Sequence, residues 1–451
     1  MCHGRLEVWA MIFSVQCSII KTVLLIIMTM IKKLIHNSFT QKVLISLYFR
    51  LNACILATVL FNLKQYVKVI GRIVRAKRLG KKIIVFYLGE RDQKNRFKNF
   101  EKVINLLEQN QIVEIFVYVT EASLAKELTD RTNIYYFRYF FCPRAIYADV
   151  YLTLAQVSMP IGPLFSKKIQ FYHAQASVDQ SFGSTFDEYD YVFCSGKQQL
   201  TDFKQLFNYR ELNGKCLITG GYLKLDRLIK DKVKSTITEN NVVVIYAPTA
   251  VSYNASNEIN GILQINTMYS LQTSGFEIIK SLLDSDYKVI FRPHPGDLKE
   301  YSQGYPYVKR ILNTYKGHPQ LFFDDSKDYF ETYQSSALMI SDISGTAFTY
   351  AYVFEKPVIL FLPNQSDLSI DVENLSSIGY QFGDRCETLV HTTDDLKIKV
   401  KDILENPEVY RERVVNFRDD NLFNFGCSSE YLAKNIDYVL NDTKHPDWEY
   451  L

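Results

Sequence analysis

Two short apolar runs in the C-terminal half of the chain constrain its fold most, because each ends abruptly in polar, turn-forming residues. Residues 289–291 lead into Arg-Pro-His-Pro at 292–295, and residues 338–340 lead into Ser-Asp-Ile-Ser-Gly-Thr at 341–346. Continuous apolar runs of this kind are typical of strands buried on both faces of a parallel sheet. Ligands of open α/β sheets bind at the carboxyl ends of strands, near the point where strand order reverses. We therefore expect both turns to face one crevice.

Apolar, strand-like runs alternate with amphipathic, helix-like stretches beyond residue 81, which predicts βαβ units and parallel sheets. The expected strands are residues 82–88, 112–119, 134–137, 148–152, 168–172, 190–194, 242–247, 288–291, 321–323, 337–340 and 357–361. The expected helices are residues 94–109, 122–128, 224–234, 276–283, 347–354, 393–404 and 428–440. A polar stretch at 235–241 divides the chain. The predicted α/β architecture is an N-terminal segment, 1–78, and two Rossmann-like, doubly wound domains, 79–235 and 236–451.

The charge of the chain is divided unevenly. The net charge is +3, but residues 1–82 hold 14 Lys/Arg and one acidic residue, which gives +13. The remainder holds 38 basic and 48 acidic residues, which gives −10. Such asymmetry favours a basic segment that meets an anionic surface, with a solvated basic helix face as the alternative. No nucleic-acid partner is expected, because no nucleic-acid-binding motif accompanies the charge.

Two apolar runs precede a basic cluster that consists of Lys64, Lys68, Arg72, Arg75, Lys77, Arg78, Lys81 and Lys82. Residues 8–30 are interrupted by Gln16 and Lys21, and residues 43–63 contain Arg50 and Asn52. A charge at mid-span costs a few kcal/mol, so neither run is a clean transmembrane helix. Apolar stretches followed by basic residues are typical of interfacial anchors on anionic membranes. We predict peripheral, monotopic attachment to the cytoplasmic face of the cell membrane; a spanning helix and a soluble domain are the alternatives.

His294 lies between two prolines at the end of an expected strand. Proline fixes its own φ angle and disfavours helix for the residue before it, which holds the imidazole at the strand end. There it is expected to donate to a phosphoryl or acceptor oxygen; a turn histidine that only caps the strand is the alternative. Arg292 is expected either to bind a phosphate through two hydrogen bonds or to pair with an acidic residue of the protein.

Ser344, Gly345 and Thr346 form the second turn and open an expected helix. Backbone N–H groups at a helix start bind phosphate oxygens, and glycine lets a ligand approach the backbone closely. A serine that caps the helix beside a packing glycine is the alternative. Asp342 is expected to orient this turn, and Thr249, at another strand end, to contact phosphate.

Five segments occur in an informative order: Phe-Tyr-His at 171–173, Asp-Tyr-Val-Phe-Cys-Ser-Gly at 190–196, Tyr-Ala-Pro-Thr at 246–249, Arg-Pro-His-Pro at 292–295 and Ser-Asp-Ile-Ser-Gly at 341–345. In these segments the chain resembles the CDP-glycerol glycerophosphotransferase family, enzymes of teichoic acid and capsule polymer assembly with a GT-B fold. The resemblance implies two Rossmann-like domains facing a cleft. The first would hold the acceptor and the second the nucleotide donor.

The resemblance also implies roles for two further residues. His173 falls at a family histidine that is a candidate general base, and a neutral-range pKa suits deprotonation of an acceptor hydroxyl. Thr349 stands where the family usually has an acidic residue that in related GT-B enzymes holds the ribose hydroxyls, so it is a donor-binding candidate. Ala174 replaces a family glycine. These two departures from the family pattern support a non-enzymatic alternative, a scaffold that keeps the fold but has lost catalysis.

The resulting hypothesis is a membrane-associated transferase. It would move glycerol phosphate, or a related polyol phosphate, from a CDP-activated donor to a lipid-linked or polymer acceptor of the cell surface. Neither a metal nor a cofactor is expected, because no Asp-x-Asp pair lies in a site context and no two of the eight cysteines have CxxC spacing. A GT-B glycosyltransferase of capsule assembly and a nucleotide-sugar 2-epimerase are the enzymatic alternatives.

Overall fold

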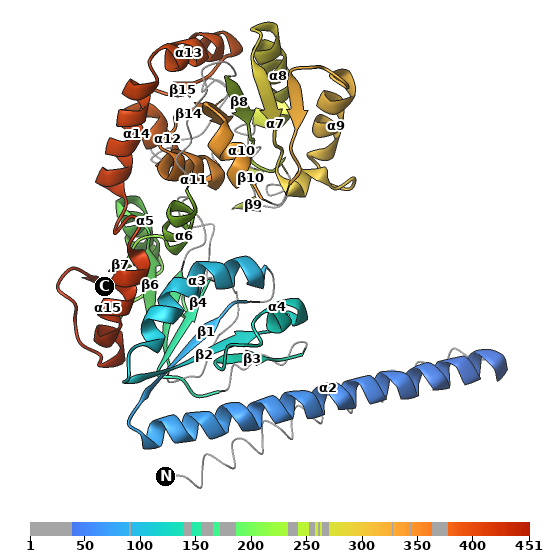
Figure 1. Ribbon diagram of the computed structural model, residues 1–451, viewed down its shortest axis with the longest axis vertical. Helices are drawn as coiled ribbons and strands as arrows, with labels where there is room; N and C mark the ends of the chain where they lie inside the picture. Colours follow the sequence, from blue (N-terminus) through green and yellow to red (C-terminus); the bar gives the residue numbers. More distant parts are fainter. Residues whose placement is uncertain are drawn as a thin grey trace. The chain divides into compact units, whose positions relative to one another are not determined.

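The computed structural model describes residues 38–89, 92–138, 146–154, 166–171, 186–232, 242–251, 258–259, 262–263, 270–326, 328–342, 344–362 and 378–451 (Figure 1). These residues belong to two compact units. The first comprises residues up to 69 together with 137–141, and the second comprises 70–136 and 142–451. The predicted site residues that the structure describes all lie in the second unit.

A single long helix, α2 (Ser38–Arg78), contains the second interrupted apolar run and most of the basic cluster that follows it. In the first unit, the amide of Asn62 donates to the backbone oxygen of Arg138 at 2.8 Å and accepts from its N–H at 2.8 Å. Phe61 and Tyr66 pack on Arg138 and Phe137 from the same helix. Among the helices of the described residues, none combines the length and apolar character that crossing a bilayer requires.

The last turns of α2 belong to the second unit and are tied to its first sheet by ion pairs. Arg72 Nε lies 2.5 Å from Glu114 Oε1, and Lys77 Nζ lies 2.6 Å from Asp149 Oδ2. All four side chains are at least partly shielded from water. The pKa of Asp149 is lowered: burial alone would raise it, but the hydrogen bonds from Lys77 and from the Ile83 backbone outweigh this.

The first sheet has eight strands in the order β16-β7-β6-β5-β4-β1-β2-β3. Every pairing is parallel except that of β16 with β7. Strand order reverses beside β1, which pairs with β2 on one side and β4 on the other. The strands are β1 (Lys82–Tyr87), β2 (Val113–Val119), β3 (Ile134–Tyr136), β4 (Val150–Thr153), β5 (Lys167–Phe171), β6 (Tyr191–Cys194), β7 (Cys216–Thr219) and β16 (Glu449–Tyr450).

Helices cover this sheet, and α3 does so with the apolar face that the sequence predicted. In α3 (Gln93–Glu108) the buried apolar residues are Phe97, Phe100, Val103, Ile104 and Leu107, which confirms the expected stripe. The other helices of this half are α4 (Ala122–Glu127), α5 (Lys197–Tyr209) and α6 (Leu223–Asp231). The end of the chain also returns here: α15 (Ser428–Leu440) packs on α3, and β16 extends the sheet. No local pattern in the sequence indicates this return.

The second sheet has six parallel strands in the order β12-β11-β8-β13-β14-β15. They are β8 (Val243–Tyr246), β11 (Lys288–Phe291), β12 (Leu321–Phe323), β13 (Leu338–Ser341), β14 (Val358–Phe361) and β15 (Leu389–Val390). Around it lie α7 (Ser270–Thr273), α8 (Gly275–Asp284), the 3-10 helix η3 (Pro295–Leu298), α9 (Tyr305–Thr314), α10 (Phe330–Ser335), α11 (Gly345–Phe354), α12 (Ile378–Arg385), α13 (Thr393–Glu405) and α14 (Pro407–Asn421). A two-stranded ribbon joins β9 (Glu258–Ile259) and β10 (Ile262–Leu263).

Separate apolar clusters cover the two faces of this sheet, which explains why its strands are apolar throughout. Ile245 and Met339 point into one cluster, whereas their neighbours Val244 and Ile340 point into the other. This confirms the expectation that both faces are buried, since side chains alternate along a strand. The α6 residues Leu225 and Leu228 of the preceding half also belong to the first cluster.

Candidate functional site

Three loops meet at the carboxyl edge of the second sheet, where strand order reverses. After β8 the chain moves to β11 on one side, and it later returns to β13 on the other side of β8. Hydrogen bonds join the end of β8 to its two neighbours. Arg292 N, just after β11, donates to Tyr246 O at 2.9 Å, and Ser341 Oγ, at the end of β13, donates to Ala247 O at 2.6 Å. The turns that the sequence singled out therefore lie on neighbouring strands at the reversal point, as expected for a ligand site.

Asp342 is the centre of this edge. Its carboxylate accepts hydrogen bonds from both the N–H, at 2.8 Å, and the hydroxyl of Thr249. Its other oxygen accepts from Ser270 N at 3.0 Å and from Ser270 Oγ at 2.9 Å. Asp342 is fully buried; burial raises its pKa, and these hydrogen bonds oppose the rise. Asp342 thus holds the β8 loop and the start of α7 against β13, and the Thr249 hydroxyl is engaged in that role.

His294 follows β11 and is half-buried. Its Nδ1 accepts the N–H of Gly296 at 3.0 Å, so a neutral ring carries its proton on Nε2. Burial lowers the pKa of His294; Asp297 opposes this shift and Lys299 adds to it. At neutral pH the ring is therefore a neutral hydrogen-bond donor through Nε2. A Cβ at position 296 would lie 3.0 Å from the ring nitrogen, so a side chain there would press against the imidazole.

Arg292 pairs with a carboxylate of its own chain, the second of the two arrangements considered from the sequence. Its Nη1 lies 2.5 Å from Asp324 Oδ2, and its Nη2 donates to Ser326 O at 2.8 Å. Burial alone would raise the pKa of Asp324, but hydrogen bonds from Ser326, Thr332 and Arg292 lower it. The guanidinium also lies over the ring of Tyr329, 5.9 Å from its centroid.

The turn after β13 caps α11. Ser344 Oγ accepts from Thr346 N at 3.4 Å, and the Thr346 hydroxyl bonds the hydroxyl of Tyr333. Ser344, Gly345 and Thr346 are half-buried, whereas Thr349 is 1% exposed and donates to Gly345 O at 3.2 Å. The serine cap considered from the sequence is therefore present, at a helix start that remains partly accessible. The hydroxyl of Thr349 supports this turn from inside the helix.

Tyr333 and Lys356 form a support that the sequence did not identify as part of the site. Burial raises the pKa of Tyr333 to about 12, so its hydroxyl stays protonated beside Thr346. Lys356 Nζ donates to the backbone oxygens of Tyr333, Gln334 and Ser336 at 2.6–3.1 Å. Burial lowers the pKa of Lys356 to about 8. These carbonyls close the end of α10, so the lysine fixes the helix that carries Tyr333.

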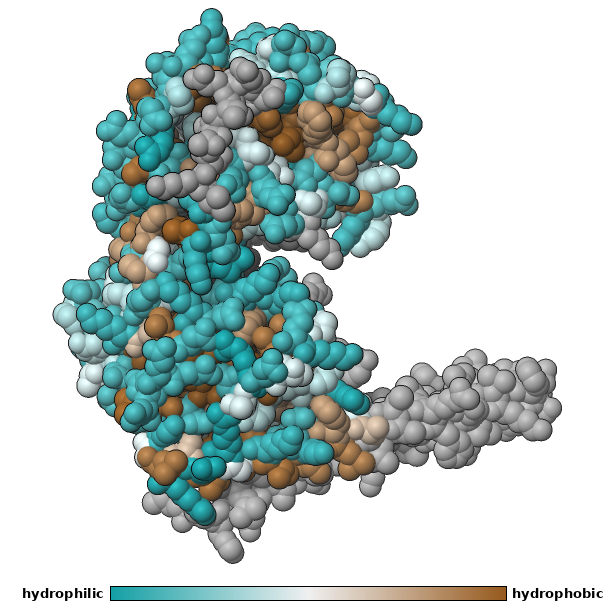
Figure 2. All heavy atoms as spheres, viewed as in Figure 1, coloured by the Kyte–Doolittle hydropathy of each residue, from teal (hydrophilic) through white to brown (hydrophobic). Residues whose placement is uncertain are grey.

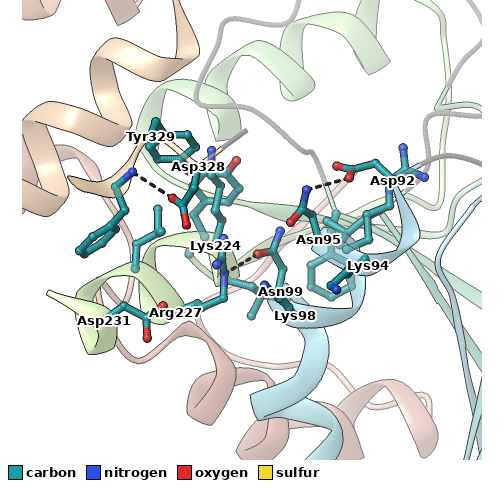
Figure 3. Close-up of a pocket in the computed structure, with 18 of the residues that line it drawn as sticks. Asp92, Lys94, Asn95, Lys98, Asn99, Lys224, Arg227, Asp231, Asp328 and Tyr329 are labelled. Atoms are coloured by element: carbon teal, nitrogen blue, oxygen red, sulfur yellow. Dashed lines mark hydrogen bonds between the residues drawn. The ribbon is translucent and has the colours of Figure 1, made fainter. Parts of the chain in front are cut away.

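His173, the predicted general base, lies outside the described residues. The strand before it, β5, ends at Phe171, and that residue lines a cavity of about 950 Å³ in the second unit. Other strand ends of the first sheet, at Leu154 and Gly221, line the same cavity. Figure 3 shows side chains of α3 and α6 around this space, together with Tyr329, which also lines it.

No group of three or more His, Cys, Asp or Glu within the described ranges is placed to hold a metal ion. Polar contacts at the carboxyl edge of the second sheet come from carboxylate, hydroxyl, imidazole and backbone groups. Most of these donors are used within the edge itself, and the partly accessible start of α11 is the part of it suited to hold an anionic ligand.

Comparisons with known proteins agree with this architecture. The chain superimposes on the wall teichoic acid polymerase TagF with a TM-score of 0.50 at 14% identity, covering 84% of this chain and 98% of that one. It superimposes on a putative UDP-N-acetylglucosamine 2-epimerase from Listeria monocytogenes with a TM-score of 0.55 at 14% identity, covering 81% and 98%. At these identities the likeness concerns the fold, and it confirms the predicted GT-B architecture.

Sequence comparison gives the family. The chain is 26% identical over 217 residues to the minor teichoic acid biosynthesis protein GgaB of Bacillus subtilis (strain 168). That match covers 47% of this chain and 22% of GgaB, so the chain matches only about a fifth of that relative's length. A family model described as "CDP-Glycerol:Poly(glycerophosphate) glycerophosphotransferase" matches residues 163–437, more than half of the chain. The site lies within that match, and the chain belongs to this family, as its motifs predicted.

Proposed function

We propose that this protein is a membrane-associated transferase that moves glycerol phosphate, or a related polyol phosphate, from a CDP-activated donor to a growing cell-surface polymer. The observation that carries the proposal is the meeting of three family-matched strand ends at the reversal point of the second sheet. His294 follows β11, Asp342 follows β13 and holds Thr249, and the capped start of α11 adds Ser344.

In the proposed reaction an acceptor hydroxyl attacks the β-phosphorus of the CDP-activated polyol. A new bond forms between the acceptor oxygen and this phosphorus, and the bond from the phosphorus to the pyrophosphate bridging oxygen breaks. CMP leaves with the electron pair, and the acceptor proton passes to a base, for which His173 is the candidate. His294, neutral and protonated on Nε2, would donate to the phosphoryl oxygens, and the start of α11 would hold the diphosphate.

The donor can be tested directly with purified protein and a short polyol-phosphate acceptor. CDP-glycerol should yield CMP and an acceptor longer by one glycerol phosphate, measured by chromatography and mass spectrometry. UDP release from a UDP-sugar with a glycosylated acceptor would instead establish a sugar transferase. Interconversion of a UDP-sugar with its 2-epimer would establish an epimerase, and either result would overturn the proposal.

Helix α2 supports the membrane part of the proposal, because one of its exposed faces is apolar. Exposed apolar residues recur at intervals of three and four along the helix: Leu60, Leu63, Val67, Ile70 and Val74. This spacing places them on one face, beside a strip that contains the exposed residues Lys64, Lys68, Arg75 and Arg78. Figure 2 shows apolar residues at the surface of the described part of α2. An apolar face bordered by cations matches an interfacial helix on an anionic bilayer.

Vesicle binding tests this attachment. The full chain should bind phosphatidylglycerol vesicles more tightly than phosphatidylcholine vesicles, and the difference should shrink at high salt. The double variant Lys64→Gln/Lys68→Gln should weaken binding by roughly tenfold or more, at about 1 kcal/mol for each charge. Lys397→Gln/Lys401→Gln, on α13, removes the same charge elsewhere and should change little. Equal weakening by both pairs would show only net-charge attraction and no α2 face.

A further inference from the structure

A buried tyrosine connects the arginine that follows β11 to the first turn of α11. The guanidinium of Arg292 pairs with Asp324, with Nη1 2.5 Å from Oδ2. Burial raises the pKa of Tyr333 to about 12, and hydrogen bonding with Thr346 and the nearby Arg292 opposes this rise. The hydroxyl of Tyr333 bonds the hydroxyl of Thr346. Arg292 is therefore linked to the candidate donor turn through one phenol.

The position of this phenol is fixed from several sides. Helix α10, which carries it, packs on α11 (Figure 1). Thr332 Oγ1 donates to Asp324 Oδ2 at 2.7 Å, so the carboxylate that holds the arginine also holds α10. The ring of Tyr333 is 1% exposed and packs on Tyr329 and Tyr350, with centroids 4.7 and 5.5 Å away. Its hydroxyl thus has little freedom to leave Thr346.

The neighbours of Tyr333 indicate the direction of its hydrogen bond. A guanidinium has donors and no acceptor, so Arg292 favours an arrangement in which the oxygen of Tyr333 accepts. A phenol is also a stronger acid than an aliphatic hydroxyl, which makes Tyr333 the better donor of the pair. The proton of Tyr333 then lies toward Thr346, and the Thr346 hydroxyl keeps its own proton for another acceptor. Hydrogen bonds in such a series polarise one another.

The first turn of α11 gives this proton an outlet. Thr346 is half-buried, unlike Tyr333. The N–H groups of Thr346 and Ala347 already donate to Ser344, to its Oγ at 3.4 Å and its backbone oxygen at 3.0 Å. The Thr346 hydroxyl can therefore supply a donor at a helix start where the helix dipole favours an anion.

We propose that Arg292, Tyr333 and Thr346 form a hydrogen-bond relay whose last proton, on Thr346 Oγ1, is donated to the diphosphate of the nucleotide donor. The inference rests on the proposed function and adds to it how the donor is held. Tyr333 is a positioning residue, and Arg292 acts through it without touching the ligand. The relay strengthens binding of the diphosphate and does not contact the acceptor.

Calorimetric titration of the full chain with CDP tests the relay. Thr346→Val, which keeps the shape of the side chain, should weaken CDP binding by roughly tenfold or more, since a bond to an ionised group is lost. Tyr333→Phe should weaken it by roughly three- to tenfold. The double variant should bind no worse than Thr346→Val, because the two residues act as one unit. Thr346→Ser keeps the hydroxyl and should stay within about threefold of the wild type. Unchanged affinity in a folded Tyr333→Phe or Thr346→Val, or additive losses, would overturn the relay.

Tyr350→Phe is the matched control, because it removes a hydroxyl from the same aromatic cluster. The Tyr350 hydroxyl bonds Ser336 Oγ at 3.0 Å and not the start of α11. This variant should lose stability in urea much as Tyr333→Phe does, but its CDP affinity should stay within about twofold of the wild type. An equal loss of CDP affinity in both variants would reduce Tyr333 to a packing role and overturn the proposal.

The part of Arg292 is tested in two backgrounds. Arg292→Gln should weaken CDP binding in the wild type and add little in Tyr333→Phe, because the arginine acts through the phenol. An equal loss in both backgrounds would show that Arg292 contacts the donor directly, and the relay would be wrong.

Kinetics separate this inference from the proposed function. In Tyr333→Phe the KM for the CDP-activated donor should rise, whereas the acceptor KM and the kcat at saturating donor should change by less than about twofold. Coupled CDP binding in a wild type that transfers no polyol phosphate would refute the proposed reaction alone. An active enzyme in which Tyr333 and Thr346 are uncoupled would refute the relay alone. If another nucleoside diphosphate binds more tightly than CDP, the same variants are compared with that nucleotide, and only the donor assignment fails.

Discussion

Two histidines of the second sheet have the same local structure but lie at opposite edges. His294 and His318 each precede a proline, and each ring Nδ1 accepts a hydrogen bond from the N–H two residues on, at 3.0 and 3.2 Å. His294 comes after β11, at its carboxyl end, whereas His318 comes just before β12. Because β11 and β12 pair in parallel, the two rings occupy the carboxyl and amino edges of the sheet.

Topology, and not the local motif, therefore assigns a chemical role to such a histidine. A His-Pro turn presents an imidazole equally well at either edge. Only the carboxyl edge also holds Asp342, Thr249 and the start of α11, because the chain reverses its strand order beside β8. A substitution at the carboxyl edge can therefore be compared with a matched one at the amino edge of the same sheet.

The largest effect is expected at the start of α11. Gly345→Val should weaken binding of the CDP-activated donor at least 100-fold, because a branched side chain would occupy the space where a phosphate approaches the backbone. Gly345→Ala should lie between the wild type and the valine variant. Isothermal titration with CDP measures both, and circular dichroism checks the fold. Unchanged CDP affinity in a folded valine variant would remove the turn from the donor site.

The histidine pair gives the next effect. His294→Ala should lower kcat by about 100-fold if its Nε2 stabilises charge on the transferred phosphoryl group. His318→Ala, at the amino edge, should leave kcat within about twofold of the wild type. Single-turnover transfer from a CDP-activated donor compares the two. Equal losses in both variants would mean that the His-Pro turn matters for folding alone, and the contrast between the edges would be wrong.

Asp342 gives a stability effect at the carboxyl edge. Asp342→Ala leaves Thr249 and Ser270 without their shared acceptor, so the free energy of unfolding should fall by about 2–3 kcal/mol. Asp284, at the end of α8 before β11, pairs with Lys280 on the surface, and Asp284→Ala should cost less than about 1 kcal/mol. Urea denaturation followed by circular dichroism measures both. Similar losses would contradict the organising role of Asp342.

The smallest effect is on the pH dependence of stability. The lowered pKa of His294 means that the unfolded chain binds a proton more readily than the folded one. Stability should therefore rise with pH in the window just below 6.5, be complete above it, and be lost as the pH falls through the folded pKa. His294→Gln should flatten this part of the urea-midpoint profile, whereas His318→Gln should not. A profile unaltered by His294→Gln would show that another group titrates there.

Periodicity predicted those parts of the fold where the local pattern matches the local environment. Residues 288–291, 321–323 and 428–440 were predicted as the elements that the structure contains, with the same bounds. The buried face of α3 followed from its spacing. Helix α14 was missed because its apolar and charged residues are mixed, with acidic and basic residues throughout Pro407–Asn421.

Contacts between residues far apart in the chain could not be predicted from the sequence. Thr249 and Asp342 were predicted as site residues because each follows a strand end. That Thr249 and Ser270 both donate hydrogen bonds to Asp342 depends on the order of the strands in the sheet. The cavity likewise joins Lys98 and Lys224, 126 positions apart, by folding α3 against α6. Neither lysine carries a local motif. The roles predicted for His173 and for the donor-binding residues remain predictions for the experiments above.

The return of α15 and β16 to the first sheet has a consequence for how the protein is made. Strands β1 to β7 leave the ribosome long before Leu432, Ile436 and Trp448, which complete their apolar core. Until those residues emerge, the edge of β7 lacks its partner and the sheet keeps an uncovered apolar surface. The half that is synthesised first is therefore finished last, and a premature stop after α14 would leave a chain with an intact second sheet and a first half prone to aggregation.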